Sequence, residues 1–180
     1  DKLIATEYLT TFSKLIRTLF QNSDKRQISL YDELETCRLY TKLEAMRLNG
    51  KLKYNFDINT DLDLKSLMVP ALIVQPFIEN AIWHGIVPKE KEGEVNVTVT
   101  GNHEEIVCTI DDNGIGRMLS LLNSPDLSLN HESRGERISQ ARLDIERILY
   151  DISATIKTID KYDDDDKSQG TKVIITFKLQ

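Results

Sequence analysis

The first fifty residues carry apolar side chains at helical spacing. Between residues 3 and 20 an apolar side chain recurs every three or four positions, which predicts an amphipathic helix. After a polar break, a second helix is predicted over 29–48, because Ser29 and Asp32 form an S-x-x-D start signal and Asn49-Gly50 suits a helix end. Little else nearby can cover the two apolar stripes, so we expect a partner helix to pack on them.

From residue 51 onward the period of the pattern changes to two, which predicts strands. The alternating segments are 51–58, 94–100, 105–110, a weaker 153–159, and 172–179. Helical stretches are predicted at about 69–86, 117–123 and 135–150. Strands with one apolar face, together with helices that can cover it, predict an α+β fold: a two-layer α/β sandwich with mainly antiparallel pairing. The chain is thus expected to divide into a helical segment, 1–49, and a domain, 50–180.

Composition narrows the class of protein. Of the 180 residues, 40% are hydrophobic and 29% are charged, as in soluble globular proteins. The net charge of −6 argues against a nucleic-acid partner, because such binding depends on cationic contacts to phosphate. Cys37 and Cys108 lack metal-type spacing and are expected to be buried thiols, and no apolar run is long enough to span a bilayer. The chain starts without Met and already in helical pattern, so we expect an excised fragment.

Polar side chains interrupt the most apolar segment of the chain. The stretch "QPFIENAIWHGI", residues 75–86, places Glu79, Asn80 and His84 on what the pattern predicts to be a buried helix. Burying an unpaired polar group costs about 1–3 kcal/mol, so these three side chains are candidates for a functional site. Taken alone, His84 is more simply explained as a histidine whose hydrogen bonds are satisfied in the core.

A second polar stretch follows a predicted strand. In "TIDDNGIGR", residues 109–117, the strand ends in two aspartates, and Gly114 and Gly116 follow. Glycines let the backbone approach a ligand closely and adopt positive φ, and Asp112 supplies a carboxylate acceptor. Alone, D-x-G-x-G fits an ordinary hairpin connection equally well. Neither a P-loop nor a G-x-G-x-x-G pattern is present. A third stretch, with Gly170-Thr171 opening the last strand, is by itself an ordinary turn.

Together, the three stretches resemble the GHKL superfamily of ATP-binding proteins. The segments "YLTTFSKLIR", "ISLYDELETCRLYTKLEAMRL", "VPALIVQPFIENAIWHGI" and "DDNGIGR" are similar to sensor histidine kinases of the LytS type. The E-N-A-x-x-H-G pattern is the most specific part of this resemblance. It implies the GHKL fold, with a mixed and mostly antiparallel sheet, and ATP and Mg²⁺ as ligands.

The resemblance also implies roles for the trio on helix 75–86. Asn80 would coordinate the Mg²⁺ that bridges the nucleotide phosphates, since an amide oxygen suits this ion. Glu79 would orient or deprotonate the attacking group, or hold a metal-bound water. His84 and Gly85 would contact phosphate. Gln75 stands where many relatives carry a second Asn.

The remaining roles implied by the resemblance concern the base and the lid. Asp112 would accept a hydrogen bond from the adenine amino group, and Gly114 and Gly116 would let the loop close over the base. Thr171 would support adenine recognition through a water. In the lid stretch "NSPDLSLNHESRGERIS", Gly135 is the glycine expected near phosphate.

A LytS-type kinase transfers the γ-phosphoryl group of ATP to a histidine, which passes it to a response regulator. The three histidines of the chain, His84, His103 and His131, are in no such motif, so the acceptor is expected on a missing upstream helix. The resemblance further implies a homodimer formed through the N-terminal helices. It also implies a cytoplasmic position for this part of a protein anchored in the bacterial inner membrane by its N-terminal part.

Two other functions remain open from the sequence. One is a GHKL ATPase that drives a conformational clamp, although the chain lacks a transducer domain and has Gln75 in place of an acid. The other is a catalytically silent nucleotide-binding module, which the joint presence of Glu79, Asn80 and Asp112 disfavours.

Overall fold

A five-stranded sheet forms the centre of the molecule. The computed structural model describes residues 2–22, 24–117, 120 and 154–179. The strands are β2 (Leu52–Asn59), β4 (Gly93–Gly101), β5 (Glu105–Asp112), β6 (Ala154–Tyr162) and β7 (Ser168–Lys178), in the order β2-β4-β5-β7-β6. The β2–β4 pair is parallel and the other three pairs are antiparallel. The predicted mixed, mostly antiparallel sheet is therefore confirmed.

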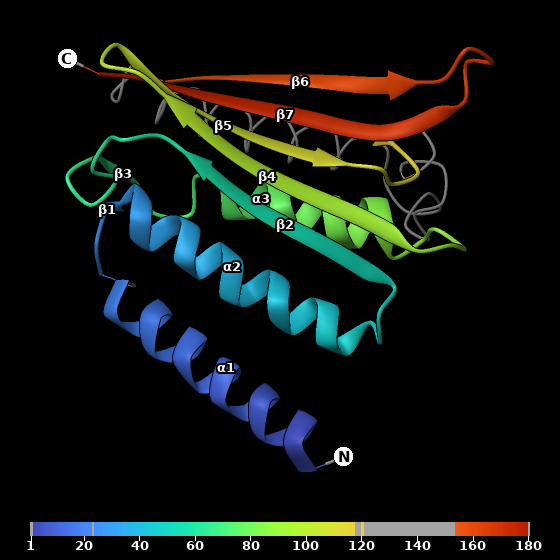
Figure 1. Ribbon diagram of the computed structural model, residues 1–180, viewed down its shortest axis with the longest axis horizontal. Helices are drawn as coiled ribbons and strands as arrows, with labels where there is room; N and C mark the ends of the chain where they lie inside the picture. The colour runs from blue at the N-terminus through green and yellow to red at the C-terminus, as the bar shows by residue number, and fades with distance from the viewer. Residues whose placement is uncertain (1, 23, 118–119, 121–153, 180) are drawn as a thin grey trace, which may run out of the picture.

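The helices form a second layer on one face of this sheet. Figure 1 shows α2 (Leu30–Arg47) and α3 (Gln75–Asn80) against the sheet, with α1 (Lys2–Asn22) on the far side of α2. A π-helix, η1 (Ala81–Ile86), continues α3 without a break, and we call the two together helix 75–86. This arrangement is the predicted two-layer α/β sandwich.

The ends of α2 follow the sequence signals. The Ser29 hydroxyl accepts a hydrogen bond from the backbone N–H of Asp32 at 3.0 Å, as the S-x-x-D signal predicts. At the other end, Asn49 and Gly50 have φ angles of 49° and 85°, a left-handed conformation that Gly adopts at little cost.

The predicted helix over 69–86 is wrong in its first third. Met68–Pro70 is a short strand, β3, which pairs with β1 (Gln27–Ser29) in a separate two-stranded sheet. Leu72 then adopts a positive φ of 65°, so the helix begins only at Gln75, with Pro76 in its first turn. Of the helices predicted at 117–123 and 135–150, the second and most of the first lie outside the described residues.

The core lies between the sheet and the helices α2 and 75–86. It includes Leu30, Leu34 and Cys37 of α2, Ile78, Ile82 and Ile86 of helix 75–86, and the inward residues of β4 and β5 such as Val97 and Cys108. Both cysteines are buried free thiols, as expected. Because α2 contributes to the same core as the sheet, the boundary at residue 49 stays a prediction.

Helix α1 is far more exposed than α2. Among its residues only Thr11 and Leu15 are buried, and the large side chains left exposed are Leu3, Ile4, Tyr8, Leu9, Phe12 and Phe20. None of the helices in the described part of the chain has the length and apolar character needed to cross a membrane.

Candidate functional site

The three polar stretches singled out in the sequence lie next to one another. The carbonyl oxygen of Gly85, near the end of helix 75–86, accepts a hydrogen bond from the Ile115 N–H at 3.0 Å. A Cβ atom on Gly85 would lie only 3.1 Å from Asp112 Oδ1, so the helix backbone runs directly beside the Asp112 carboxylate. On the other side of this turn, a Cβ atom on Gly170 would lie 2.8 Å from the Asn113 Cα.

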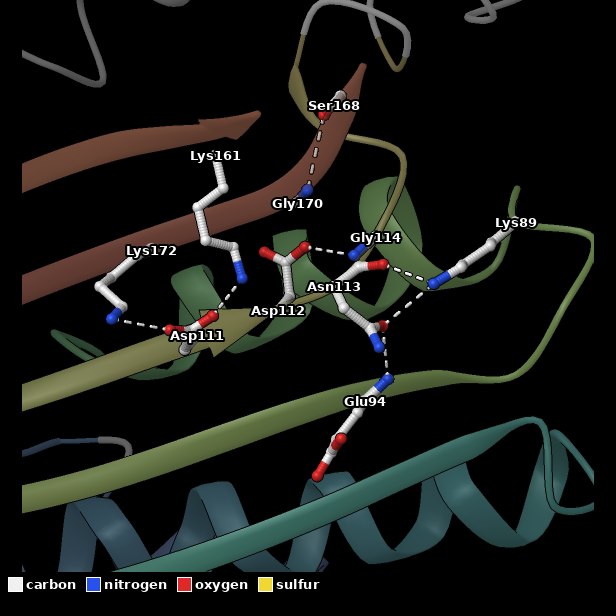
Figure 2. Close-up of polar contacts among 10 residues, drawn as sticks. All are labelled: Lys89, Glu94, Asp111, Asp112, Asn113, Gly114, Lys161, Ser168, Gly170 and Lys172. Carbon is white, nitrogen blue, oxygen red and sulfur yellow. Dashed lines mark hydrogen bonds and ion pairs between the residues drawn. The ribbon is translucent and has the colours of Figure 1, made fainter. Parts of the chain in front are cut away.

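Asp112 is a buried carboxylate at the point where these segments meet. Its exposed fraction is 5%, and its Oδ1 accepts a hydrogen bond from the Gly114 N–H at 2.8 Å (Figure 2). Burial raises the pKa of Asp112, while hydrogen bonds from the backbone N–H groups of Gly114 and Thr171 work in the opposite direction. The arrangement fixes an acceptor that a ligand N–H group can use.

Two of the glycines around Asp112 are needed for the close approach of backbone segments. A Cβ atom on Gly114 would lie 2.7 Å from the Gly85 carbonyl oxygen, which is closer than real Cβ atoms approach other heavy atoms. Gly170 has a φ of 102° and a Cβ there would overlap the backbone of Asp112. Gly116, predicted to let the loop close, also has a positive φ, of 77°.

Asn113 joins the turn after β5 to the loop that follows helix 75–86. Its side-chain oxygen accepts a hydrogen bond from the Glu94 N–H at 2.8 Å (Figure 2). The Lys89 ammonium donates to the Asn113 carbonyl oxygen at 2.6 Å and to its side-chain oxygen at 3.3 Å. Lys89 therefore holds the turn in place.

Asp111 and Asp112 are adjacent, but their surroundings are opposite. Asp111 forms ion pairs with Lys161 and with Lys172, the latter at 2.9 Å (Figure 2). Partial burial alone would raise the pKa of Asp111, but hydrogen bonds from the two lysines outweigh it and lower the pKa. Successive strand residues point to opposite faces of a sheet, so Asp111 supports the strand ends from the face away from Asp112.

On helix 75–86 the predicted site residues are less buried than the sequence suggested. Asn80 and His84 are exposed and Glu79 is half-buried, because Ile78 and Ile82 turn the apolar face of the helix toward the sheet. The Glu79 carboxylate accepts a hydrogen bond from the Gln75 side chain at 2.7 Å. Within the described residues, the Asn80 and His84 side chains have no hydrogen-bond partner, so both are available to a ligand.

The donor set on this face suits Mg²⁺. The described residues contain no group of three or more His, Cys, Asp and Glu side chains able to hold a metal ion. Magnesium usually takes one or two protein ligands and completes its shell with water and substrate phosphate. This preference fits the free amide oxygen of Asn80, which has the Glu79 carboxylate next to it in the sequence.

Other residues near the site were not predicted from the sequence. Glu33 is a buried carboxylate on α2 that binds the backbone just before helix 75–86. Burial raises its pKa, and hydrogen bonds from three backbone N–H groups act against that rise. The sequence contained a signal for Glu33, because this residue lies on the apolar stripe of α2, three residues after Leu30 and four before Cys37. Gly135, predicted near phosphate, lies outside the described residues.

Comparisons with known proteins show similarity to histidine kinases. The family model described as "Histidine kinase" matches residues 1–52. The sensor histidine kinase/phosphatase LytS of Staphylococcus aureus, strains MRSA252 and Mu50, is 32% identical over 115 residues. That stretch covers 62% of this chain and 19% of each relative, so the chain spans about a fifth of their length.

A solved structure shows the same fold. The histidine kinase domain from the Erythrobacter litoralis EL346 blue-light activated histidine kinase superposes with a TM-score of 0.51 at 17% identity. The match covers 96% of this chain and 75% of that domain. This chain thus shares its fold with that histidine kinase domain.

Proposed function

We propose that this chain, which is related to the sensor histidine kinases of the LytS type, is the ATP-binding catalytic part of such a kinase. It would transfer the γ-phosphoryl group of ATP to a histidine outside these 180 residues, from which a response regulator receives it. The observation that carries the proposal is the meeting of Gly85, Asp112 and Gly170-Thr171 around one buried carboxylate.

The base would bind on the side of β5 and β7. Asp112 would accept a hydrogen bond from the adenine amino group, with Thr171 beside it and the backbone of Gly114 closing over the ring. Gly116 supplies the positive φ with which the chain leaves this turn. Because Asp112 is buried and already bonded to backbone N–H groups, it needs little reordering when a base arrives.

The phosphates would bind along the exposed face of helix 75–86. Asn80 would hold Mg²⁺, which supplies charge neutralisation between the phosphates. Glu79 would orient or deprotonate the attacking group, while His84 and Gly85 would contact phosphate oxygens, and Gly135 would do so from the lid. In phosphoryl transfer, the contribution of such residues is mainly positioning.

The acceptor histidine would come from a helix that pairs with α1. Supporting this, α1 leaves Leu3, Ile4, Leu9 and Phe12 exposed, an apolar surface suited to a helical partner and to a homodimer. None of His84, His103 and His131 is proposed as the acceptor. In the full-length protein we expect the N-terminal part to provide the membrane anchor, with this part in the cytoplasm.

The test compares the 180-residue chain with the same chain extended upstream to include the acceptor segment. The short chain should bind Mg²⁺-ATP, hydrolyse it slowly and form no stable phospho-protein. The extended chain should acquire label from γ-labelled ATP in an acid-labile, base-stable form, as expected for an N–P bond. An acceptor His→Gln change should remove that label.

Two results would contradict the proposal that this chain is part of a kinase. Rapid ATP hydrolysis by the short chain would favour a clamp ATPase instead. Binding of ATP without any transfer from the extended chain would favour a catalytically silent nucleotide-binding module.

A further inference from the structure

Glu33 is the one acidic side chain among the buried polar residues of α2. Its exposed fraction is 1%, yet its carboxylate forms no ion pair with any described residue. Both oxygens instead accept backbone N–H groups from one short segment. Oε2 accepts a hydrogen bond from the Leu72 N–H at 3.0 Å. Oε1 accepts hydrogen bonds from the Val74 N–H at 2.9 Å and the Gln75 N–H at 3.3 Å. This segment leads directly into helix 75–86.

The backbone at Leu72 is in a conformation that its own side chain does not favour. Its φ is 65°, a left-handed value that is unfavourable for residues other than Gly, Asn and Asp. The side chain is 52% exposed, so burial of the Leu72 side chain does not explain the conformation. The Leu72 N–H instead points at the Glu33 carboxylate, and this hydrogen bond offsets the strain.

Helix α2 also contacts the other end of helix 75–86. The indole N–H of Trp83 donates to the Tyr40 hydroxyl at 2.9 Å, and the Arg47 guanidinium lies 4.4 Å from the centre of the Trp83 ring. Tyr40 and Arg47 belong to α2, as Glu33 does. Glu79 and Asn80 lie between the two attachment points, so the position of their backbone depends on both.

We propose that Glu33 is a positioning residue for Glu79 and Asn80, acting through the N–H groups at the start of helix 75–86. The proposal rests on the proposed function of those two residues. A carboxylate suits the task because it is an acceptor only, and its two oxygens serve three donors. A glutamine would turn an NH₂ group toward at least one backbone N–H and leave that donor unpaired.

The site itself offers a contrast that separates positioning from general stability. Asp112 is held by Gly114 and Thr171, with no contribution from Glu33. A change at Glu33 should therefore weaken the part of ATP affinity that Mg²⁺ adds through Asn80. The affinity for ATP without Mg²⁺, which depends on the Asp112 side, should remain.

The experiment measures ATP affinity with and without Mg²⁺ for Glu33→Gln and for Glu35→Gln, a matched change at a half-buried glutamate of α2 that pairs with Arg38 instead of the backbone before helix 75–86. Trp83 is the only tryptophan, so acrylamide quenching of its fluorescence reports directly on helix 75–86. Glu33→Gln should reduce the Mg²⁺-dependent gain in affinity at least tenfold and change Trp83 quenching. Glu35→Gln should match the parent in both measurements.

Rescue provides the second arm. In Glu33→Gln/Leu72→Gly, glycine adopts the left-handed φ without help, so part of the Mg²⁺-dependent gain should return. If Glu33→Gln fails to fold, Glu33→Asp keeps both oxygens but sets them one methylene further away, and it should show a smaller loss. A folded Glu33→Gln or Glu33→Asp with parental quenching and parental Mg²⁺-dependent gain would overturn the proposal.

Failure of the proposed function would look different. If the parent chain does not bind ATP, the kinase assignment fails for all variants alike. The quenching of Trp83 in Glu33→Gln, and its return toward the parental value in the double variant, would still test whether Glu33 positions helix 75–86.

Discussion

On the side of β5 and β7, Asp112 and Thr171 are buried and hydrogen-bonded, whereas Asn80 and His84 on helix 75–86 are exposed, with no side-chain hydrogen bond to another described residue. The first side is complete before a ligand arrives, so little ordering is needed when a base binds. The second side presents free donors and acceptors on a helix whose position is fixed from α2. Base recognition and metal binding should therefore respond separately to mutation.

The largest effect is expected where the two sides touch. In Gly114→Ala, the new methyl group would overlap the Gly85 backbone, so the turn and the helix must separate. We expect a loss of ATP affinity of at least a hundredfold and a free energy of unfolding lower by about 1–3 kcal/mol. Calorimetry and urea denaturation measure the two quantities.

Gly50→Ala is the matched control for this change. Gly50 also has a positive φ, but nothing lies within 4 Å of its Cβ position, so a methyl group there has no neighbour to displace. It should lower stability through backbone strain alone and leave ATP affinity intact. If Gly114→Ala binds ATP with the same affinity as the parent chain, the contact between Gly85 and Gly114 has no part in ATP binding.

The next largest effect is expected on the exposed face of helix 75–86. Asn80→Ala removes an exposed side chain, so the free energy of unfolding should change by no more than about 0.5 kcal/mol. The Mg²⁺-dependent tightening of ATP binding should be abolished, while Mg²⁺-free binding stays. Isothermal titration with and without Mg²⁺ checks this, with circular dichroism as the test of fold. Parental Mg²⁺-ATP affinity would refute the role of Asn80.

A smaller effect is expected from the buried side. Asp112→Asn keeps the shape but loses the charged acceptor, and one charge-assisted hydrogen bond contributes about 1.5–3 kcal/mol. The preference for adenine over guanine nucleotides should fall by about 10- to 150-fold, in competition measurements with a labelled ATP analogue. If adenine and guanine nucleotides compete as they do against the parent, Asp112 does not read the base.

The alternation of apolar residues predicted all five strands of the main sheet, because one buried face imposes a period of two on each. The capping signal at Ser29 likewise located α2, since it depends on residues three apart. The start of helix 75–86 was misplaced because the left-handed turn at Leu72 depends on Glu33, 39 residues earlier. Local sequence propensity cannot predict a contact between residues so far apart in the chain.

The candidate site, like the fold, could be predicted from the sequence only in part. The D-x-G-x-G and Gly170-Thr171 stretches named the residues that meet around Asp112, because their backbone requirements are local. The exposure of Asn80 was not predicted, since the apolar sequence on both sides of it hid which face of the helix meets the sheet. The bond from Lys89 to Asn113 was not predicted from the sequence, because it depends on where two loops come together.

The smallest effect is expected at Asp111, which sharpens the comparison with its neighbour. Its pKa lies below the ordinary value of 3.8, so its stabilising contribution is present above that pH and is lost as the pH falls through the lowered pKa. The pKa of Asp112 is raised, so its contribution is complete below 3.8 and is lost as the pH rises through the raised pKa. NMR titration of the two carboxyl carbons should show these opposite shifts.

Asp111→Asn should then lower the free energy of unfolding at neutral pH by no more than about 1 kcal/mol, because Lys161 and Lys172 are partly exposed to solvent. The difference from the parent should shrink as the pH falls below 3.8, where the parent loses the same charge. Nucleotide selectivity should stay within twofold of the parent, because Asp111 faces away from the base. A loss of adenine preference as large as that in Asp112→Asn would show that both aspartates serve the base, and that the division between support and recognition is wrong.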